Sequence, residues 1–220
     1  MRTPKVSCTT PTPNLITKIL IKGDTTECFP VVAFNMEQKD TQYYDDFENN
    51  LLEKLLGQLT SLSVLEGTLL GSEDIDARWH DLAPEYMADA VPQIRDYPTV
   101  SVAWAAYLGL AVAKGWDTDW ERCSQANFQS YYGEQGFDDM DEHIVRDLLG
   151  LPLDGYEARA LEDVIRRCAE ASVTRIRHEH IEPQSPMAFH IFARACKVMY
   201  RLGAAIELKR LGYKFEKMDV

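Results

Sequence analysis

The residues from Thr99 to Ala113 constrain the fold more than any other part of the chain. They form a run of fifteen residues without a charged side chain, between Asp96 and Lys114. A helix that is apolar on every face must be surrounded by other elements or by lipid, because it has no side to present to water. At about 1.5 Å per residue the run spans roughly 22 Å, less than the ~30 Å hydrocarbon core of a bilayer. The sequence therefore predicts a helix buried at the centre of a bundle, with small side chains that let its neighbours approach closely.

Periodic apolar residues and capping residues predict helices on both sides of this run. Apolar side chains recur at three- and four-residue steps from Thr41, which predicts a long amphipathic helix that ends near Gly71. Ser72 should begin a second helix, which Pro84 and Pro92 should shorten or break. The bounds expected for the later helices are 98–115, 118–132 (capping pair Thr118-x-x-Glu121), 138–149, 154–181 (capping pair Asp154-x-x-Glu157) and 185–212.

The alternation of apolar and polar residues that is typical of a strand does not occur after residue 35. We therefore predict an all-α fold with a single multi-helix bundle of about seven helices around the central apolar helix. The predicted helical domain covers residues 36–215, and residues 216–220 form a C-terminal tail.

The first 35 residues do not follow the helical pattern. Pro4, Pro11, Pro13 and Pro30 interrupt them, and they offer little apolar surface to bury. This composition predicts an irregular N-terminal extension that is disordered or loosely docked. Because the helical pattern begins just after Met36, one hypothesis is that Met36 is the true translation start.

The net charge of −12 argues against a general affinity for nucleic acid or for anionic membranes, since both are polyanions. The charge is unevenly distributed. Residues 36–165 contain 8 Lys and Arg against 27 Asp and Glu, whereas residues 166–220 contain 11 against 6. We expect the basic C-terminal helices to pack beside the acidic ones, in the same molecule or in a second copy.

The five cysteines are widely spaced and include no C-x-x-C pair. This usage predicts reduced thiols and a cytoplasmic protein, with Cys168 and Cys196 as small core residues. The sequence also shows no apolar run followed by a cleavage site that would be typical of a secretory signal.

The densest group of candidate catalytic residues lies where two C-terminal helices should meet. His178, Glu179, His180 and Glu182 close one predicted helix, and His190 lies one turn into the next. An antiparallel hairpin would bring His190 near the others, where a histidine and a carboxylate could act as an acid–base pair. The alternative is a hairpin stabilised by mixed charges at a helix C-terminus. No metal or cofactor is expected, because the Glu-x-x-His and His-Glu-x-x-His spacings are absent.

Aromatic residues are dense around the end of the central helix. The five candidates for lining a ligand pocket are Trp104, Tyr107, Trp116, Trp120 and Tyr131. The alternative is that these rings simply pack the central helix against the element that follows it.

Two charged groups have both a functional and a structural interpretation. Arg194, Lys197 and Arg201 form a basic stripe that could bind an anionic partner, for which the acidic half of the chain is the nearest candidate. The acidic run of Asp138, Asp139, Asp141 and Glu142 could bind a divalent cation, but it lacks the spaced ligands and the glycine of a calcium loop, and its place at a helix N-terminus explains it.

Nucleotide-binding and hydrolase signatures such as a P-loop or G-x-S-x-G are absent. Two hypotheses for function remain. The first is a non-enzymatic module that associates with itself or with a protein partner, and it is preferred because no catalytic set converges. The alternative is a helical bundle that binds or hydrolyses a small molecule, using the 178–190 hairpin or the aromatic residues.

Overall fold

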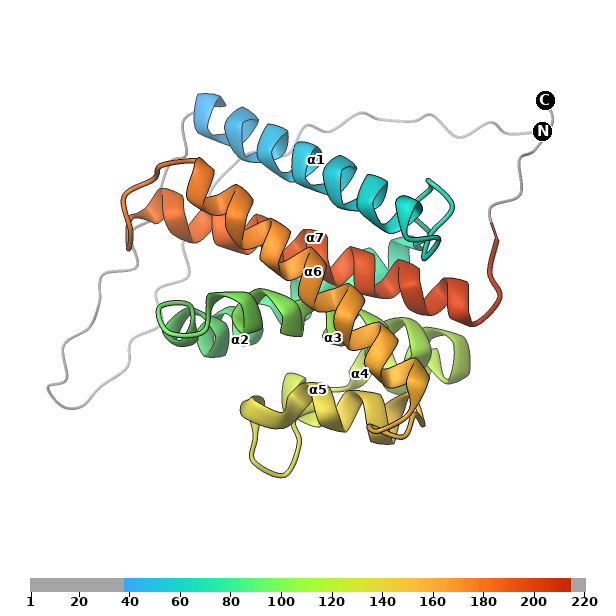
Figure 1. The fold of residues 1–220 in the computed structure, drawn as a ribbon. Helices are drawn as coiled ribbons and strands as arrows, with labels where there is room; N and C mark the ends of the chain where they lie inside the picture. The colour runs from blue at the N-terminus through green and yellow to red at the C-terminus, as the bar shows by residue number, and fades with distance from the viewer. Residues whose placement is uncertain (1–37, 215–220) are drawn as a thin grey trace, which may run out of the picture. The chain divides into compact units, whose positions relative to one another are not determined.

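The computed structural model describes residues 38–214, and within them the fold is an all-α bundle of seven α-helices, as the sequence predicts (Figure 1). The helices are α1 (Gln38–Ser61), α2 (Glu73–Gln93), α3 (Pro98–Thr118), α4 (Trp120–Gln125), α5 (Met140–His143), α6 (Tyr156–His178) and α7 (Pro186–Arg210). Two 3-10 turns, η1 (Phe128–Tyr131) and η2 (Phe137–Asp139), and a π-helical turn, η3 (Ile144–Leu148), complete the described elements. The predicted N-terminal extension, the C-terminal tail and the proposed start at Met36 lie outside the described residues.

The uncharged run forms the middle of α3, and almost all of its side chains are buried. Helix α7 is its closest neighbour. The two helices run parallel, since the Ser101 carbonyl faces the Cys196 thiol and, further along, Ala106 faces Gly203. A Cβ added at Gly109 or at Gly203 would overlap the backbone of the other helix. The expectation of a buried central helix with small residues at its contacts is therefore confirmed.

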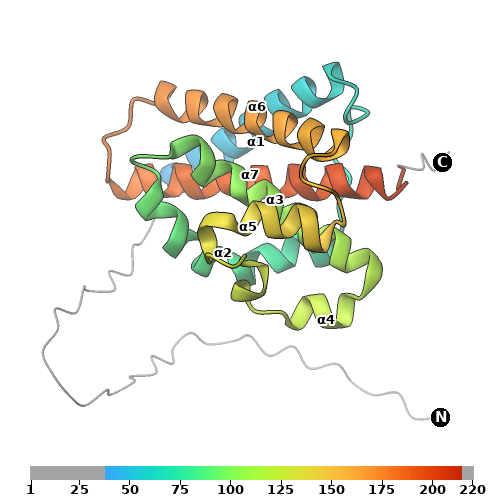
Figure 2. The same ribbon diagram turned by 60° about the horizontal axis from the view of Figure 1, so that its bottom comes forward.

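The other long helices are arranged around the α3–α7 pair (Figures 1 and 2). Helix α6 packs against both α3 and α7, and α1 lies on α6 and α7, on the side away from α2. Helix α2 packs against α3 and also contacts α7. Helix α5 and η3 pack against α3 and lie at the lower side of the bundle in Figure 1. This arrangement puts α5 and the first half of α6 beside the middle of α3.

Helix α2 corrects one prediction, because it continues through both Pro84 and Pro92. Proline at position 84 removes one backbone hydrogen bond and should weaken the helix. Packing outweighs that cost, since α2 buries apolar side chains both before and after Pro84: Ile75, Trp79, Leu82, Tyr86, Met87 and Ala90.

Several predicted helix ends are also wrong. Helix α1 ends at Ser61, well before Gly71. Helix α3 continues past Gly115, because this glycine is needed for packing rather than for ending the helix: a Cβ there would lie 2.6 Å from the Cys123 sulfur. The cap of α4 is Asp119 rather than Thr118, and its carboxylate accepts a hydrogen bond from the backbone of the next turn.

The two helices expected at 118–132 and 154–181 are shorter than predicted. The first is divided into α4 and η1, and the second begins at Tyr156 after a Gly155 cap and ends at His178. By contrast, Ser72 and Ser185 cap α2 and α7 as expected, each accepting a backbone hydrogen bond. Gly212 follows α7 with φ +93°, the left-handed conformation expected at that end.

Residues 38–214 contain no β-strand and no helix that is long and apolar enough to cross a membrane. Cys168 and Cys196 are buried free thiols, as predicted.

Candidate functional site

The residues of the predicted histidine cluster point in different directions. His178, His180 and Glu182 are exposed around the end of α6. Glu179 instead lies between α6 and α1, where it accepts a hydrogen bond from the Tyr43 hydroxyl, and its Oε1 lies 2.6 Å from Nη1 of Arg175. Burial and the hydrogen bond to this carboxylate raise the pKa of Tyr43 to about 12. Glu179 therefore takes part in a contact between two helices.

His190 is half-buried at the start of α7 and packs against aromatic rings of its surroundings. Its ring centroid lies 5.1 Å from that of Tyr44 and 5.7 Å from that of Phe189. In the described part of the chain, no side-chain hydrogen bond or ion pair joins His190 to Glu179 or Glu182. The α6–α7 turn thus brings these residues to one end of the bundle without an acid–base contact between them.

Trp104 and Tyr131, two of the five aromatic candidates, are core residues that line neither of the hollows described below. Trp104 lies edge-on to Phe137 at a centroid distance of 4.4 Å, within a group of rings from α2, α3, η1 and η2. Tyr131 is buried, and its hydroxyl lies 3.8 Å from the Cys123 sulfur.

The other three aromatic candidates differ from one another. Trp116 is partly buried near the end of α3, packed on Tyr213, and Trp120 is partly buried against the core. Tyr107 alone among the five lines one of the two hollows described below.

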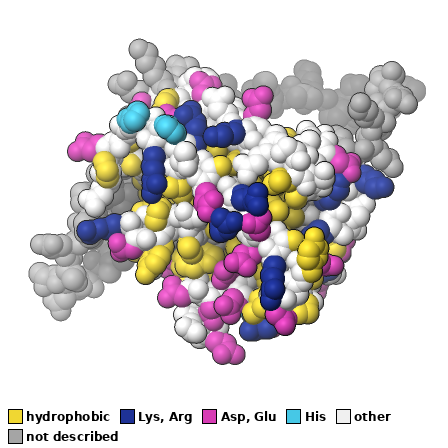
Figure 3. Space-filling model, in the orientation of Figure 1, with side chains coloured by type: hydrophobic (Ala, Val, Ile, Leu, Met, Phe, Trp, Pro, Cys, Tyr) yellow, Lys and Arg dark blue, Asp and Glu magenta, His cyan; other side chains and the backbone are white. Residues whose placement is uncertain are grey.

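A hollow of about 240 Å³ opens between α3, α5 and α6, and we call it the acidic pocket. It is lined by Tyr107 of α3, Asp141 and Glu142 of α5, Val145 of η3, Leu153 of the following loop, and Ala158 and Glu162 of α6. Figure 3 shows Asp and Glu side chains gathered on the part of the surface where α5 lies in Figure 1. The pocket has an apolar side, a buried phenol and three carboxyl groups, and its lining contains no Lys or Arg.

The three carboxylates of the acidic pocket have no cationic partner. Within residues 38–214, none of Asp141, Glu142 and Glu162 forms an ion pair. Asp141 is half-buried, whereas the other two are exposed at the rim. Burial raises the pKa of Asp141, and the neighbouring charge of Glu142 adds to this, although hydrogen bonds from the backbone and from Trp104 partly oppose it. The carboxylates therefore give the pocket a concentrated negative charge.

Tyr107 is the most deeply buried polar side chain of the acidic pocket, although its hydroxyl is not a fully buried atom. The side chain is 5% exposed, and no hydrogen bond of this hydroxyl is found within the described residues. Burial raises its pKa, and the charges of Asp141 and Glu162 raise it further, so the phenol stays protonated near neutral pH. Asp141 of α5 and Glu162 of α6 line the same hollow as Tyr107.

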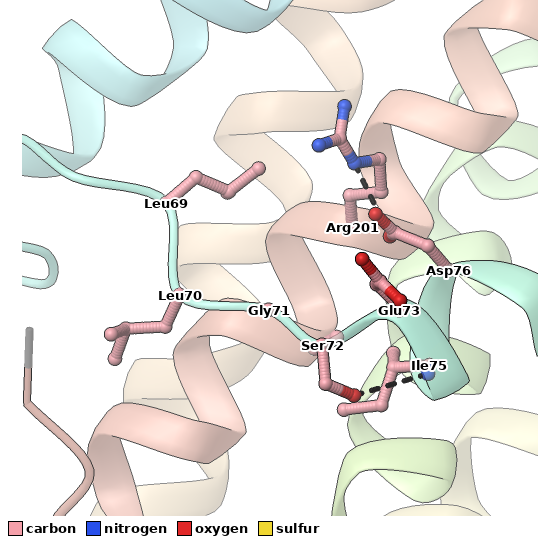
Figure 4. Close-up of a pocket in the computed structure, with 9 residues that line it drawn as sticks. Leu69, Leu70, Gly71, Ser72, Glu73, Ile75, Asp76 and Arg201 are labelled. Carbon is pink, nitrogen blue, oxygen red and sulfur yellow. Dashed lines mark hydrogen bonds and ion pairs between the residues drawn. The ribbon is translucent and has the colours of Figure 1, made fainter. Parts of the chain in front are cut away.

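A second hollow of about 280 Å³ lies beside the start of α2 (Figure 4). Three of its polar residues form contacts within the chain, and Glu73 also lines it. Nε of Arg201 lies 3.4 Å from the Asp76 carboxylate, and the Ser72 hydroxyl accepts the backbone N–H of Ile75 at 3.2 Å. The Arg201–Asp76 contact joins α7 to α2, and the Ser72 contact caps the start of α2.

The basic stripe of α7 reaches acids of the same chain. Arg194 lies 2.9 Å from Asp45 and 2.5 Å from Glu48, and Lys197 lies 2.7 Å from Glu48. The third cation, Arg201, pairs with α2 as described above. These acids belong to residues 36–165, so the basic stripe of α7 finds acidic partners within the same chain.

No three His, Cys, Asp or Glu side chains of residues 38–214 lie close enough together to hold one metal ion. The sequence matches no protein-family model, and neither curated proteins nor solved structures give a significant match.

Sequence reasoning named Tyr107 for a pocket but missed what surrounds it. In the sequence, Asp141 and Glu142 are explained by their place at a helix start, and nothing distinguishes Glu162 from other surface acids. The remaining signal in the sequence was weak, because Glu162 is an ordinary exposed acid on an amphipathic helix until α6 is placed beside α3.

Proposed function

We propose that this chain is a small-molecule-binding helical protein whose ligand occupies the acidic pocket. The observation that carries the proposal is the Tyr107 side chain, which is 5% exposed, borders an open hollow and carries a hydroxyl without a hydrogen-bond partner in the described chain. The hollow of about 240 Å³ exceeds the ~150 Å³ cavity that holds benzene and falls just below the ~300 Å³ of small drug sites. A ligand with the size of a small metabolite fits this volume.

Binding is favoured over catalysis by the residues of the lining. The pocket contains carboxyl groups and a phenol but no Ser, Cys, Lys or His that a base could activate as a nucleophile. The net charge and the reduced cysteines support a cytoplasmic protein that does not bind nucleic acid.

The test is a fragment screen monitored by NMR of protein methyl groups. We expect ligands that shift the methyls of Val145, Leu153 and Ala158. In Ala158→Leu the larger side chain fills the hollow, so the same ligands should lose at least tenfold in affinity. Ala160→Leu is the matched control, because Ala160 is exposed on the same helix. A screen in which no ligand shifts these methyls, or equal binding by both variants, would contradict the proposal.

Self-association is a second candidate, supported by exposed apolar side chains where the parallel helices α3 and α7 begin. Tyr97 is 60% exposed, Phe189 is 45% exposed, and Val100 is also exposed. If two copies of the chain meet there, light scattering should give the mass of a dimer, and the double variant Tyr97→Ser with Phe189→Ser should give a monomer. A monomeric native protein at high concentration would exclude this candidate.

A further inference from the structure

We infer that the acidic pocket binds a protonated primary amine carried on a short alkyl chain, either a free amine or a lysine side chain. This inference rests on the proposed function, because it names the chemical class of the ligand for the same site.

The charge of the pocket selects a cation. Its three carboxyl groups come from two different helices, and none has a cationic partner in the described residues. Elsewhere the buried acids of the bundle are neutralised: Glu48 by two cations of α7, and Glu207 by Arg210. An anionic ligand would add to the repulsion in the pocket, and a neutral one would leave it unrelieved.

The hydrogen-bonding groups match an alkylammonium. A primary ammonium group has three N–H donors and no acceptor. The oxygen of Tyr107, which stays protonated, and the carboxylates of Asp141 and Glu162 offer acceptors from three elements around the same hollow. Val145, Leu153 and Ala158 add an apolar surface on which an alkyl chain can lie.

A metal ion fits the same residues less well. Metal ions need several ligand atoms at about 2.0 to 2.6 Å from one centre. No three acidic, histidine or cysteine side chains in the described part of the chain are grouped closely enough for that. An ammonium group does not require three such side chains, because it has three N–H donors and the phenol oxygen of Tyr107 can accept one of them.

The test compares three six-carbon ligands with the same chain and different head groups: hexylamine, 1-hexanol and hexanoate. Affinities are measured at pH 7 by titration of the Val145, Leu153 and Ala158 methyl signals. We expect hexylamine to bind at least tenfold more tightly than the alcohol, and hexanoate not to bind. A fourth ligand, Nα-acetyl-lysine methylamide, distinguishes a lysine side chain from a free amine as the natural ligand. If the natural ligand is a lysine side chain, this compound should bind. If the natural ligand is a free amine, hexylamine should bind and this compound should not.

Variants identify the groups that recognise the ammonium. Glu162→Gln should weaken hexylamine binding about tenfold, and Tyr107→Phe should weaken it severalfold. Glu53→Gln is the matched control. Glu53 is exposed on α1 and does not line the pocket, and its substitution changes the net charge by the same amount as Glu162→Gln. Thermal unfolding of each variant confirms that it is folded.

Each outcome decides the inference separately from the proposed function. Equal binding of amine and alcohol at these methyls would overturn the choice of ligand class and leave a small-molecule site standing. Failure of all four ligands would also overturn it, while the fragment screen described above would still decide whether the pocket binds ligands at all. Equal weakening by Glu162→Gln and Glu53→Gln would show a general charge effect and contradict recognition in the pocket.

Discussion

At the scale of single residues, Glu48 shows how a buried charge is used to join helices. It is 6% exposed on α1 and contacts both Arg194 and Lys197 of α7. Burial by itself would raise the pKa of this carboxyl group, but the hydrogen bonds from Lys197 and Arg194 outweigh it, and the pKa is lowered from 4.5. A lowered pKa in the folded state means stability that is present above pH 4.5 and is lost as the pH falls through the folded value.

We therefore expect Glu48→Gln to lower the free energy of unfolding by about 1–3 kcal/mol at pH 7, because two cations lose their charged acceptor. The difference from the native protein should shrink as the pH falls from 4.5 through the lowered pKa of Glu48, where the native carboxylate is also being protonated. Urea unfolding at several pH values measures both effects, with Glu53→Gln as the control. A cost that does not change with pH would contradict the ion-pair explanation.

Asp141 has the opposite behaviour, because burial raises its pKa. Its ionised form therefore destabilises the folded state at neutral pH, and this penalty disappears as the pH falls through the raised pKa towards the unfolded value. Asp141→Asn keeps a hydrogen-bond acceptor for Trp104 but removes the charge. We expect the midpoint of thermal unfolding to rise by about 2–4 °C at pH 7, with a smaller difference at pH 3.

The same substitution should weaken hexylamine binding, so that stability and affinity change in opposite directions. Calorimetry of unfolding and the methyl titration measure the two quantities on one sample. A variant that is both less stable and unchanged in affinity would assign Asp141 to the core and not to the pocket.

At the scale of elements, the contact between α3 and α7 depends on two glycines. Gly109 and Gly203 each lie so close to the opposite backbone that a methyl group has no room. Gly109→Ala should therefore force the helices apart and cost about 3 kcal/mol or more, despite the better helix propensity of alanine. Gly57→Ala in α1 is the control, because nothing lies within 4 Å of its added Cβ, and it should be neutral or slightly stabilising. Chemical denaturation of both variants tests this, and similar stabilities would contradict the close packing.

Helices could be predicted from the sequence more reliably than their ends. The existence of α1, α3, α6 and α7 follows from local periodicity and capping residues. The ends depend on contacts that local patterns do not contain: Gly115 lies inside α3 because Cys123 packs against it, and α2 passes Pro84 because its neighbours bury the helix on both sides.

At the scale of the whole molecule, the central position of α3 could be predicted, because an uncharged helix leaves few other arrangements. The charge asymmetry also predicted that acidic and basic helices meet, and the pairs between α1 and α7 show such contacts within one chain. The acidic pocket could not be predicted in the same way. It exists only when Tyr107, Asp141 and Glu162 are brought together from three separate elements, and each of them has an ordinary explanation in its own segment.

The most direct test of this account is a set of intermolecular nuclear Overhauser effects between hexylamine and the protein with isotope-labelled methyl groups. The account predicts contacts from the alkyl protons of the ligand to the methyls of Val145, Leu153 and Ala158, and their loss in Glu162→Gln at the same ligand concentration. Contacts to Leu69 and Leu70 of the second hollow instead, or contacts that persist unchanged in that variant, would contradict it.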